Sequence, residues 1–244
     1  MDISSDSVRH YRQISYPIDC LLFDLNDTLY SSEEGIGEAF EKNIEDFLVE
    51  KCGFAEDNAP TVRLQLFRTY GTTLAGLQAL GYDIDADDYH NFVHGRLPYE
   101  FIKQDLQLRN VLQSIKQRKL VFTNSRRNHA IKILERLGLQ DCFDQIICFE
   151  ILNSNLLALP KSSLSGELSV VMKPSIEAMK IALDFIEVDP HRTLFLDDDE
   201  LNIAAGKAVG FRTVLVGKQV KSKEADFVVQ SLADLRQVVP EIWV

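Results

Sequence analysis

The feature that most constrains the fold is a series of six short apolar runs, separated by longer segments with a helical pattern. Most runs are apolar at nearly every position, which is typical of parallel strands covered by helices on both faces. We therefore expect an α/β fold, with a doubly wound, Rossmann-like core around a mostly parallel sheet. The predicted strands are CLLFD (20–24), KLVFTN (119–124), QIICF (145–149), TLFLDD (193–198), TVLVG (213–217) and DFVV (226–229).

One long segment interrupts this alternation. Within residues 31–106 no strand-like run occurs, and apolar residues at helical spacing predict several helices. We expect this segment to form an inserted all-helical cap domain over the carboxyl ends of the strands, where such sheets bind ligands. Residues 20–30 and 107–244 would form the core, and residues 1–19 a loose N-terminal arm. The Pro-, Ser- and Gly-containing segment 156–170 predicts a surface excursion.

Charge and composition limit the possible partners. The chain carries 26 basic and 37 acidic side chains, a formal net charge of -11. This excess disfavours nucleic acid polymers and anionic membranes as partners, and no apolar stretch reaches membrane-spanning length. The opening segment has neither a secretory nor a transit-peptide pattern, and the four cysteines lack C-x-x-C spacing. We therefore expect a cytoplasmic protein with free thiols.

Acidic residues close two of the predicted strands. Asp24 ends the first, and Asp197, Asp198 and Asp199 end the fourth. At one edge of a parallel sheet these carboxylates would repel one another unless a cation neutralised them. Oxygen ligands without His or Cys favour Mg²⁺ over zinc. A solvated loop or a helix N-cap is the alternative for an Asp-rich turn, and Asp199 suits the cap.

Four short motifs occur in a characteristic order along the chain: DLNDT (24–28), TNS (123–125), Lys173, and Asp197-Asp198 with Asn202. In this order they resemble the motifs of the haloacid dehalogenase superfamily of phosphatases, in the class with a small helical cap. The stretches FDLNDTLY, YGTTLAGL, VHGRLPYE and FTNSRRNHA are similar to the branch that contains pyrimidine 5'-nucleotidases and plant nucleoside-monophosphate phosphatases. The resemblance covers nearly the whole chain from Cys20 onward.

The resemblance implies Mg²⁺-dependent hydrolysis of nucleoside 5'-monophosphates, with xanthosine monophosphate favoured as the small-molecule substrate. Another nucleotide or small phosphate ester is an alternative substrate. A catalytically impaired nucleotide-binding protein is an alternative function.

The resemblance also assigns roles to single residues. Asp24 would attack phosphorus and form an aspartyl-phosphate, which splits hydrolysis into two easier displacements. Mg²⁺ would be held by the Asp24 carboxylate, the Asn26 main-chain carbonyl and the acidic turn. Within that turn Asp198 is expected to be the direct ligand and Asp197 to lie behind it, although the reverse order stays open. Phosphate would be bound by Thr123, Asn124, Ser125 and Lys173.

Position 26 departs from the family pattern. The family carries there the acid that protonates the leaving oxygen and later activates water, but this chain has Asn26. An amide keeps the shape of a carboxylate and cannot transfer the proton. We expect binding with little turnover, because losing a general acid and base costs about 10²- to 10⁴-fold in rate. The neighbouring Asp27 would project to a different side of the turn and cannot easily replace it.

Three interpretations of Asn26 compete. The favoured one is an engineered substrate-trapping variant, since every other motif is intact. A naturally impaired, ligand-sensing homologue comes second. Haloacid-dehalogenase chemistry, which lacks this second acid, is least favoured because it needs no acidic metal-binding turn.

Several cap and hinge residues are candidates for contact with the base. Aromatic rings could stack on it, and Arg or His could meet an anionic or carbonyl-rich edge. Packing within the cap or plain surface exposure is an equally good interpretation of each. A zinc site at His90 and His94 is disfavoured because no acidic ligand accompanies them. The candidates are Tyr30, Ser31, Tyr70, Thr72, Thr73, His94 and Arg96.

Overall fold

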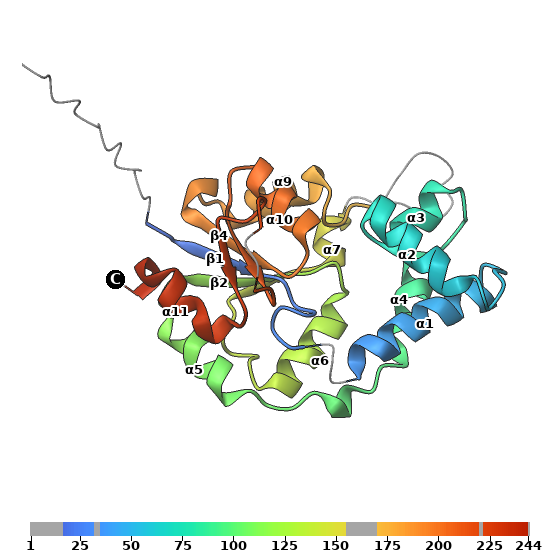
Figure 1. Cartoon of the computed structure of the whole chain (residues 1–244), viewed down its shortest axis with the longest axis horizontal. Coiled ribbons are helices and arrows are strands. Elements are labelled where there is room, and N and C mark those ends of the chain that lie inside the picture. Colours follow the sequence, from blue (N-terminus) through green and yellow to red (C-terminus); the bar gives the residue numbers. More distant parts are fainter. Residues whose placement is uncertain (1–16, 32–34, 155–169, 220–221, 244) are drawn as a thin grey trace, which may run out of the picture.

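The computed structural model describes residues 17–31, 35–154, 170–219 and 222–243, and it contains one six-stranded sheet in which every pairing is parallel (Figure 1). The strand order is β3-β2-β1-β4-β5-β6, with the chain's first strand near the middle. The predicted doubly wound α/β fold is therefore confirmed. The strands are β1 (Cys20–Phe23), β2 (Arg118–Phe122), β3 (Gln145–Ile147), β4 (Thr193–Asp197), β5 (Arg212–Val216) and β6 (Phe227–Val229).

Helices cover both faces of the sheet, which explains why the strands are apolar at consecutive positions. Leu21 and Phe23 point to one face and pack with α5 (Leu106–Ser114), α6 (Arg127–Leu137) and α11 (Leu235–Val238). Cys20 and Leu22 point to the other face and pack with α9 (Ile176–Ile186) and α10 (Glu200–Ala208). Successive side chains of a strand alternate between faces, so both sets are buried. Figure 1 shows the two helical layers on either side of the strands.

Local signals set the ends of two crossover helices. The helix α6 ends at Gly138, which has a left-handed conformation with φ of 71°, as expected for a glycine that follows a helix. The helix α9 begins at Ile176. Ser175 caps it by accepting a hydrogen bond from the Ala178 amide, and Pro174 lies just before this cap. The predicted strand 145–149 is also shorter, because Phe149 opens the helix α7 (Phe149–Leu152).

Between β1 and α5 the described residues form four α-helices and contain no strand. They are α1 (Ile36–Glu50), α2 (Ala59–Tyr70), α3 (Thr73–Ala79) and α4 (Ala86–Gly95), followed by the short 3-10 turn η2 (Tyr99–Phe101). Figure 1 shows them grouped beyond one end of the sheet. They share a separate apolar cluster, completed by Phe149, Val170 and Met172 from the rest of the chain. The domain boundaries at residues 31 and 106 stay a prediction.

Further expectations from the sequence concern the cysteines, membrane-spanning helices and two loose segments. All four cysteines are free thiols. Among the described residues, no helix combines the length and the apolar character needed to cross a bilayer. Most of the predicted arm 1–19 and nearly all of the excursion 156–170 lie outside the described residues.

The helical insert is seated on the core at Gly71. This residue follows α2 with φ of 79°, and a Cβ added there would lie 2.2 Å from Cδ of Pro174. Replacing Gly71 by Ala should cost about 1–2 kcal/mol of backbone strain and about 1–3 kcal/mol of overpacking. Gly81 is a matched control, because it has φ of 85° and nothing within 4 Å of its added Cβ. Chemical denaturation should show a larger loss of unfolding free energy for Gly71→Ala than for Gly81→Ala. Equal losses would contradict this seating.

Candidate active site

The candidate site lies at the carboxyl ends of β1 and β4. These strands are paired so that Phe23 stands beside Leu196, and the Asp24 amide donates to the Leu196 carbonyl at 2.8 Å. Asp24 therefore leaves its strand beside Asp197 and Asp198. Each of the three offers a carboxylate oxygen, and these oxygens lie within 4.8 Å of one another. The carboxyl ends of β1 and β4 therefore bring Asp24, Asp197 and Asp198 together, as expected from the sequence.

Lys173 supplies the positive charge of this cluster. Its Nζ donates to Asp24 Oδ1 and to Asp197 Oδ2, each at 2.7 Å. The side chain is only 2% exposed, and its ammonium lies 5.1 Å from the ring centre of Phe122. Asn124 fixes the backbone of Lys173, because its side chain accepts from the Lys173 amide at 2.8 Å and donates to the Lys173 carbonyl at 2.9 Å.

One ammonium does not balance three carboxylates in a buried site. Burial raises the pKa of the Asp24 carboxyl, the charge of Lys173 lowers it, and Asp197 raises it again. The net direction is upward. The pKa of Asp198 is raised by burial and by the charges of Asp24 and Asp197. Burial lowers the pKa of Lys173, but Asp197 and Asp24 raise it more. A divalent cation on oxygen ligands would relieve this repulsion.

Hydrogen bonds distinguish the two acids of the turn. Asp197 accepts from Asn202 Nδ2 at 3.0 and 3.1 Å and from the Asp199 amide at 3.0 Å, in addition to Lys173. Both of its oxygens therefore have donors already. Among the described residues, Asp198 has one hydrogen-bond contact, a 3.5 Å approach of the Thr28 hydroxyl. This difference favours Asp198 as the direct metal ligand, with Asp197 holding Lys173 behind it. Asp199 caps α10, as expected.

The predicted phosphate loop follows β2. The Thr123 hydroxyl accepts from the Ser125 amide at 3.1 Å, and both residues are buried. The loop runs directly into α6, whose first residue is Arg127, so amide groups near a helix start lie in the same region. Through Asn124 and its bonds to Lys173 the loop is tied to the acidic cluster. The structure thus brings Thr123, Asn124 and Lys173 together.

Asn26 has a dense set of polar partners. Its Oδ1 accepts from the Tyr30 hydroxyl at 2.8 Å and lies 3.1 Å from His129 Nε2. Its Nδ2 donates to Ser125 Oγ at 3.2 Å. The side chain is thus held between the hinge after β1, the helix α6 and the phosphate loop.

The remaining candidates are spread over the insert. His94 is buried and stacks on His129, with ring centres 4.3 Å apart. Thr72 caps α3 by accepting from the Ala75 amide at 3.1 Å. Thr73 is buried, and Tyr70 is exposed at the end of α2. Ser31 closes the described part of the first hinge.

Arg96 has its contacts within the insert, and its predicted contact with the base stays a prediction. Its guanidinium stacks 3.8 Å from the ring centre of Phe92 and approaches Glu50 at 3.5 Å. With Asp88 and Phe92 it lines a cavity of about 610 Å³ on the insert. Asp88 and Phe92 lie on one side of α4, where Arg96 follows just past the helix end, and His90 and His94 lie on the other side. The helical period therefore turns Arg96 outward when His94 faces the core.

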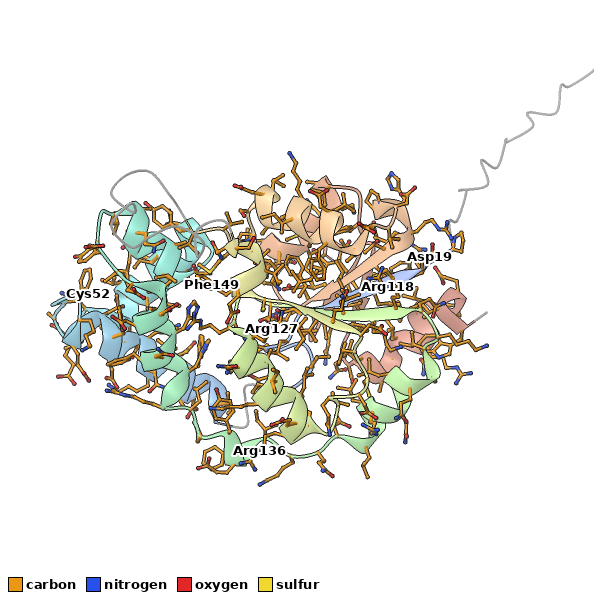
Figure 2. All side chains as sticks on the ribbon, turned by 180° about the vertical axis from the view of Figure 1, so that it is seen from behind. Asp19, Cys52, Arg118, Arg127, Arg136 and Phe149 are labelled. Carbon is orange, nitrogen blue, oxygen red and sulfur yellow. The ribbon has the colours of Figure 1, made fainter. Side chains whose placement is uncertain are left out.

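Contacts between α4 and the core were not expected from the sequence. Arg126 pairs with Asp87 of α4 and lies 3.6 Å from Glu150 of α7. His90 packs edge-on against Phe149, with ring centres 4.6 Å apart, and Figure 2 shows Phe149 where α7 meets the insert. Sequence reasoning also missed His129 as a partner of Asn26. It lies within the quoted stretch FTNSRRNHA, in the first turn of α6, and its place in that stretch is the signal that could have identified it.

Comparisons with known proteins give a family match and several relatives. The family model described as haloacid dehalogenase-like hydrolase matches residues 18–210. Phosphate metabolism protein 8 of Saccharomyces cerevisiae is 31% identical over 132 residues, which are 51% of this chain and 41% of that protein. The chain thus matches about two fifths of the yeast protein's length. Pyrophosphatase PpaX of Bacillus pumilus is 24% identical over 236 residues, 91% of this chain and 96% of that protein.

Solved structures share the fold. CbbY from Rhodobacter sphaeroides in complex with phosphate has a TM-score of 0.60 at 19% identity, covering 89% of this chain and 96% of that one. YfnB from Bacillus subtilis bound to magnesium has a TM-score of 0.59 at 18% identity, covering 91% and 98%. At these identities the likeness concerns the fold alone.

The raised carboxyl pKa values predict a pH-dependent response to Mg²⁺. An acid with a raised folded-state pKa keeps its proton at pH values where the unfolded chain has lost it, so stability in EDTA should fall as pH rises above 3.8, the ordinary Asp value. Mg²⁺ binds the deprotonated carboxylates, so its stabilisation should grow with pH, reaching about 2.7 kcal/mol at 100-fold excess over Kd. Thermal unfolding with and without Mg²⁺ from pH 5.5 to 8.5 measures this.

The variant Asp198→Asn is the control for that experiment, because it removes the expected direct ligand and leaves Lys173 paired with Asp24 and Asp197. It should lose most of the Mg²⁺ effect at every pH. Full stabilisation of this variant by Mg²⁺ would contradict the assignment of the metal to the acidic turn.

Proposed function

Because this chain belongs to the haloacid dehalogenase-like hydrolase family, we propose that it is built as a Mg²⁺-dependent phosphatase of nucleoside 5'-monophosphates. The observation that carries the proposal is the carboxylate of Asp24. It follows β1, is oriented by the buried Lys173, and lies beside two further acids. A nucleophile, a fixed cation and an expected metal site occupy one strand edge, next to the phosphate loop.

The proposed reaction begins at Asp24. Its carboxylate oxygen forms a bond to phosphorus while the bond from phosphorus to the nucleoside oxygen breaks, leaving an aspartyl-phosphate. Lys173 holds the attacking carboxylate and offers positive charge to the phosphoryl oxygens. Thr123 and the loop around Ser125 bind the phosphoryl group. Bound Mg²⁺ would supply charge neutralisation between the Asp24 carboxylate and the phosphate. Water then cleaves the aspartyl-phosphate, which restores Asp24 and releases phosphate.

Both steps need proton transfer that Asn26 cannot provide. The leaving nucleoside oxygen must gain a proton, and the attacking water must lose one. An amide near neutral pH does neither, so this chain should hold its substrate and turn it over slowly. A substrate-trapping variant made by design remains the favoured interpretation, ahead of a natural nucleotide-sensing homologue. Dehalogenase chemistry stays least favoured, because the acidic turn and Lys173 are both in place.

Support for the substrate class comes from two directions. The stretches FDLNDTLY and VHGRLPYE resemble those of plant xanthosine monophosphate phosphatase, which favours that nucleotide as substrate. The insert presents aromatic and imidazole rings toward the core near Asn26, including His94 and Tyr99.

We further propose a cytoplasmic location, where such nucleotides are found. Inorganic pyrophosphate is the second candidate substrate, because the pyrophosphatase match spans 91% of this chain.

Restoring the acid should restore turnover. In the Asn26→Asp chain we expect phosphate release to rise about 10²- to 10⁴-fold, because the general acid and base return. The measurement is phosphate release from xanthosine, guanosine, uridine and cytidine monophosphates and from pyrophosphate, with Mg²⁺ present. The double variant Asp24→Asn with Asn26→Asp is the control, and it should be inactive because the nucleophile is gone.

The panel separates the alternatives. Release from pyrophosphate alone would replace the nucleotide proposal by the second candidate. If Asn26→Asp released phosphate from no nucleotide while the original chain still bound one, the nucleotide-binding interpretation would replace the enzymatic one.

A further inference from the structure

We propose that Tyr30 and His129 are positioning residues that hold the side chain at position 26 in one orientation, with its Nδ2 directed at the phosphate loop. The inference deepens the proposed function and rests on it. Neither residue is expected to touch the phosphate. Both act through Asn26, and Tyr99 acts in turn through His129.

The first support is the arrangement of donors and acceptors around Asn26. Two groups converge on Oδ1, the Tyr30 hydroxyl at 2.8 Å and His129 Nε2 at 3.1 Å, while Nδ2 reaches Ser125 Oγ at 3.2 Å. An amide oxygen accepts two hydrogen bonds and donates none. The three contacts therefore occupy both acceptor sites of Oδ1 and one of the two N–H donors of Nδ2.

The second support is the control of the His129 tautomer. His129 is buried, and in a neutral imidazole one ring nitrogen donates while the other accepts. The Tyr99 hydroxyl lies 2.7 Å from Nδ1 and 3.3 Å from the His94 carbonyl. When the hydroxyl proton occupies the shorter contact, Nδ1 accepts it. The ring proton then lies on Nε2, aimed at Asn26 Oδ1.

The third support is the origin of these groups in the chain. Tyr30 lies on the segment that leaves the core, and Tyr99 lies on the segment that returns from the insert. His129 belongs to α6 and stacks on His94 of α4. Both connections to the insert therefore reach the side chain at position 26. Its orientation depends on the insert being seated on the core.

The consequence is chemical. With Oδ1 engaged, the amide presents N–H groups to the loop of Thr123 and Ser125, where they can donate to an ester oxygen instead of repelling it. A carboxylate introduced by Asn26→Asp would have one oxygen held by the same two donors. Its other oxygen would face the loop, where the leaving group needs a proton. The same orientation of the side chain thus serves substrate binding in the Asn26 chain and proton transfer in the Asn26→Asp chain.

The test on the chain as it exists is spectroscopic. Carboxamide ¹⁵N–¹H₂ signals of Asn26 can be assigned in this chain by their loss in Asn26→Asp. Tyr30→Phe and His129→Leu should each shift or broaden these signals. His129→Gln keeps an N–H donor and should restore them in part. Tyr82→Phe removes a hydroxyl from the insert, where Tyr82 packs on Phe54, and should leave them unchanged. Unmoved Asn26 signals in both test variants would overturn the proposal.

The second test separates positioning from plain packing. In the Asn26→Asp chain, Tyr30→Phe and His129→Leu should lower kcat about tenfold and leave KM within about threefold, because the proton carrier is misdirected while phosphate binding persists. His129→Gln should recover part of kcat. A rise in KM with kcat unchanged would overturn the proposal in favour of packing. If Asn26→Asp released no phosphate at all, the proposed function would fail, and the carboxamide signals would still decide the positioning.

Discussion

The buried ammonium of Lys173, bonded to Asp24 and Asp197, is the interaction on which the site depends. Taking these charges out of water is costly, and their attraction repays the cost only when the geometry is good and other donors satisfy the remaining lone pairs. The fold meets this condition through distant segments. Parallel pairing of β1 with β4 places the two acids side by side, Asn124 fixes the backbone of Lys173, and Asn202 bonds both oxygens of Asp197. Removing the ammonium alone would leave uncompensated carboxylates, a change that typically costs about 3–5 kcal/mol.

The parts of this arrangement that could be predicted from the sequence are those fixed by strand periodicity. A run such as CLLFD is apolar on both faces, so it must lie inside the sheet, and the acid that ends it must emerge at the carboxyl edge. The position of Lys173 followed only from motif order, because nothing local distinguishes it from a solvated lysine. His129 and Tyr99 could not be found in this way. They approach Asn26 from 103 residues away and through a second partner, and no local pattern encodes a contact of that kind.

Helical geometry determines which side chains of α4 face the core. His94 and Arg96 were both candidates for contact with the base, and residues two apart on a helix differ by about 200° in direction. His94 packs on His129, so Arg96 turns outward to Phe92 and Glu50. The same geometry explains why Asp87 and His90 also contact the core. Once one core-facing residue of α4 is known, the helical period predicts the directions of the others. Which residue faces the core could not be predicted from the sequence.

Position 26 illustrates how binding and proton transfer can be separated within one side chain. A carboxylate and a carboxamide have nearly the same shape, and the donors supplied by Tyr30 and His129 suit an oxygen in either. The difference arises on the other side of the group, toward Ser125, where the amide offers N–H and the carboxylate offers an oxygen. Near a phosphate ester the N–H is attractive and cannot be lost, so it favours the bound state and leaves the barrier high. Slow turnover and retained binding would then have one cause, the chemical asymmetry of an amide whose orientation its neighbours fix.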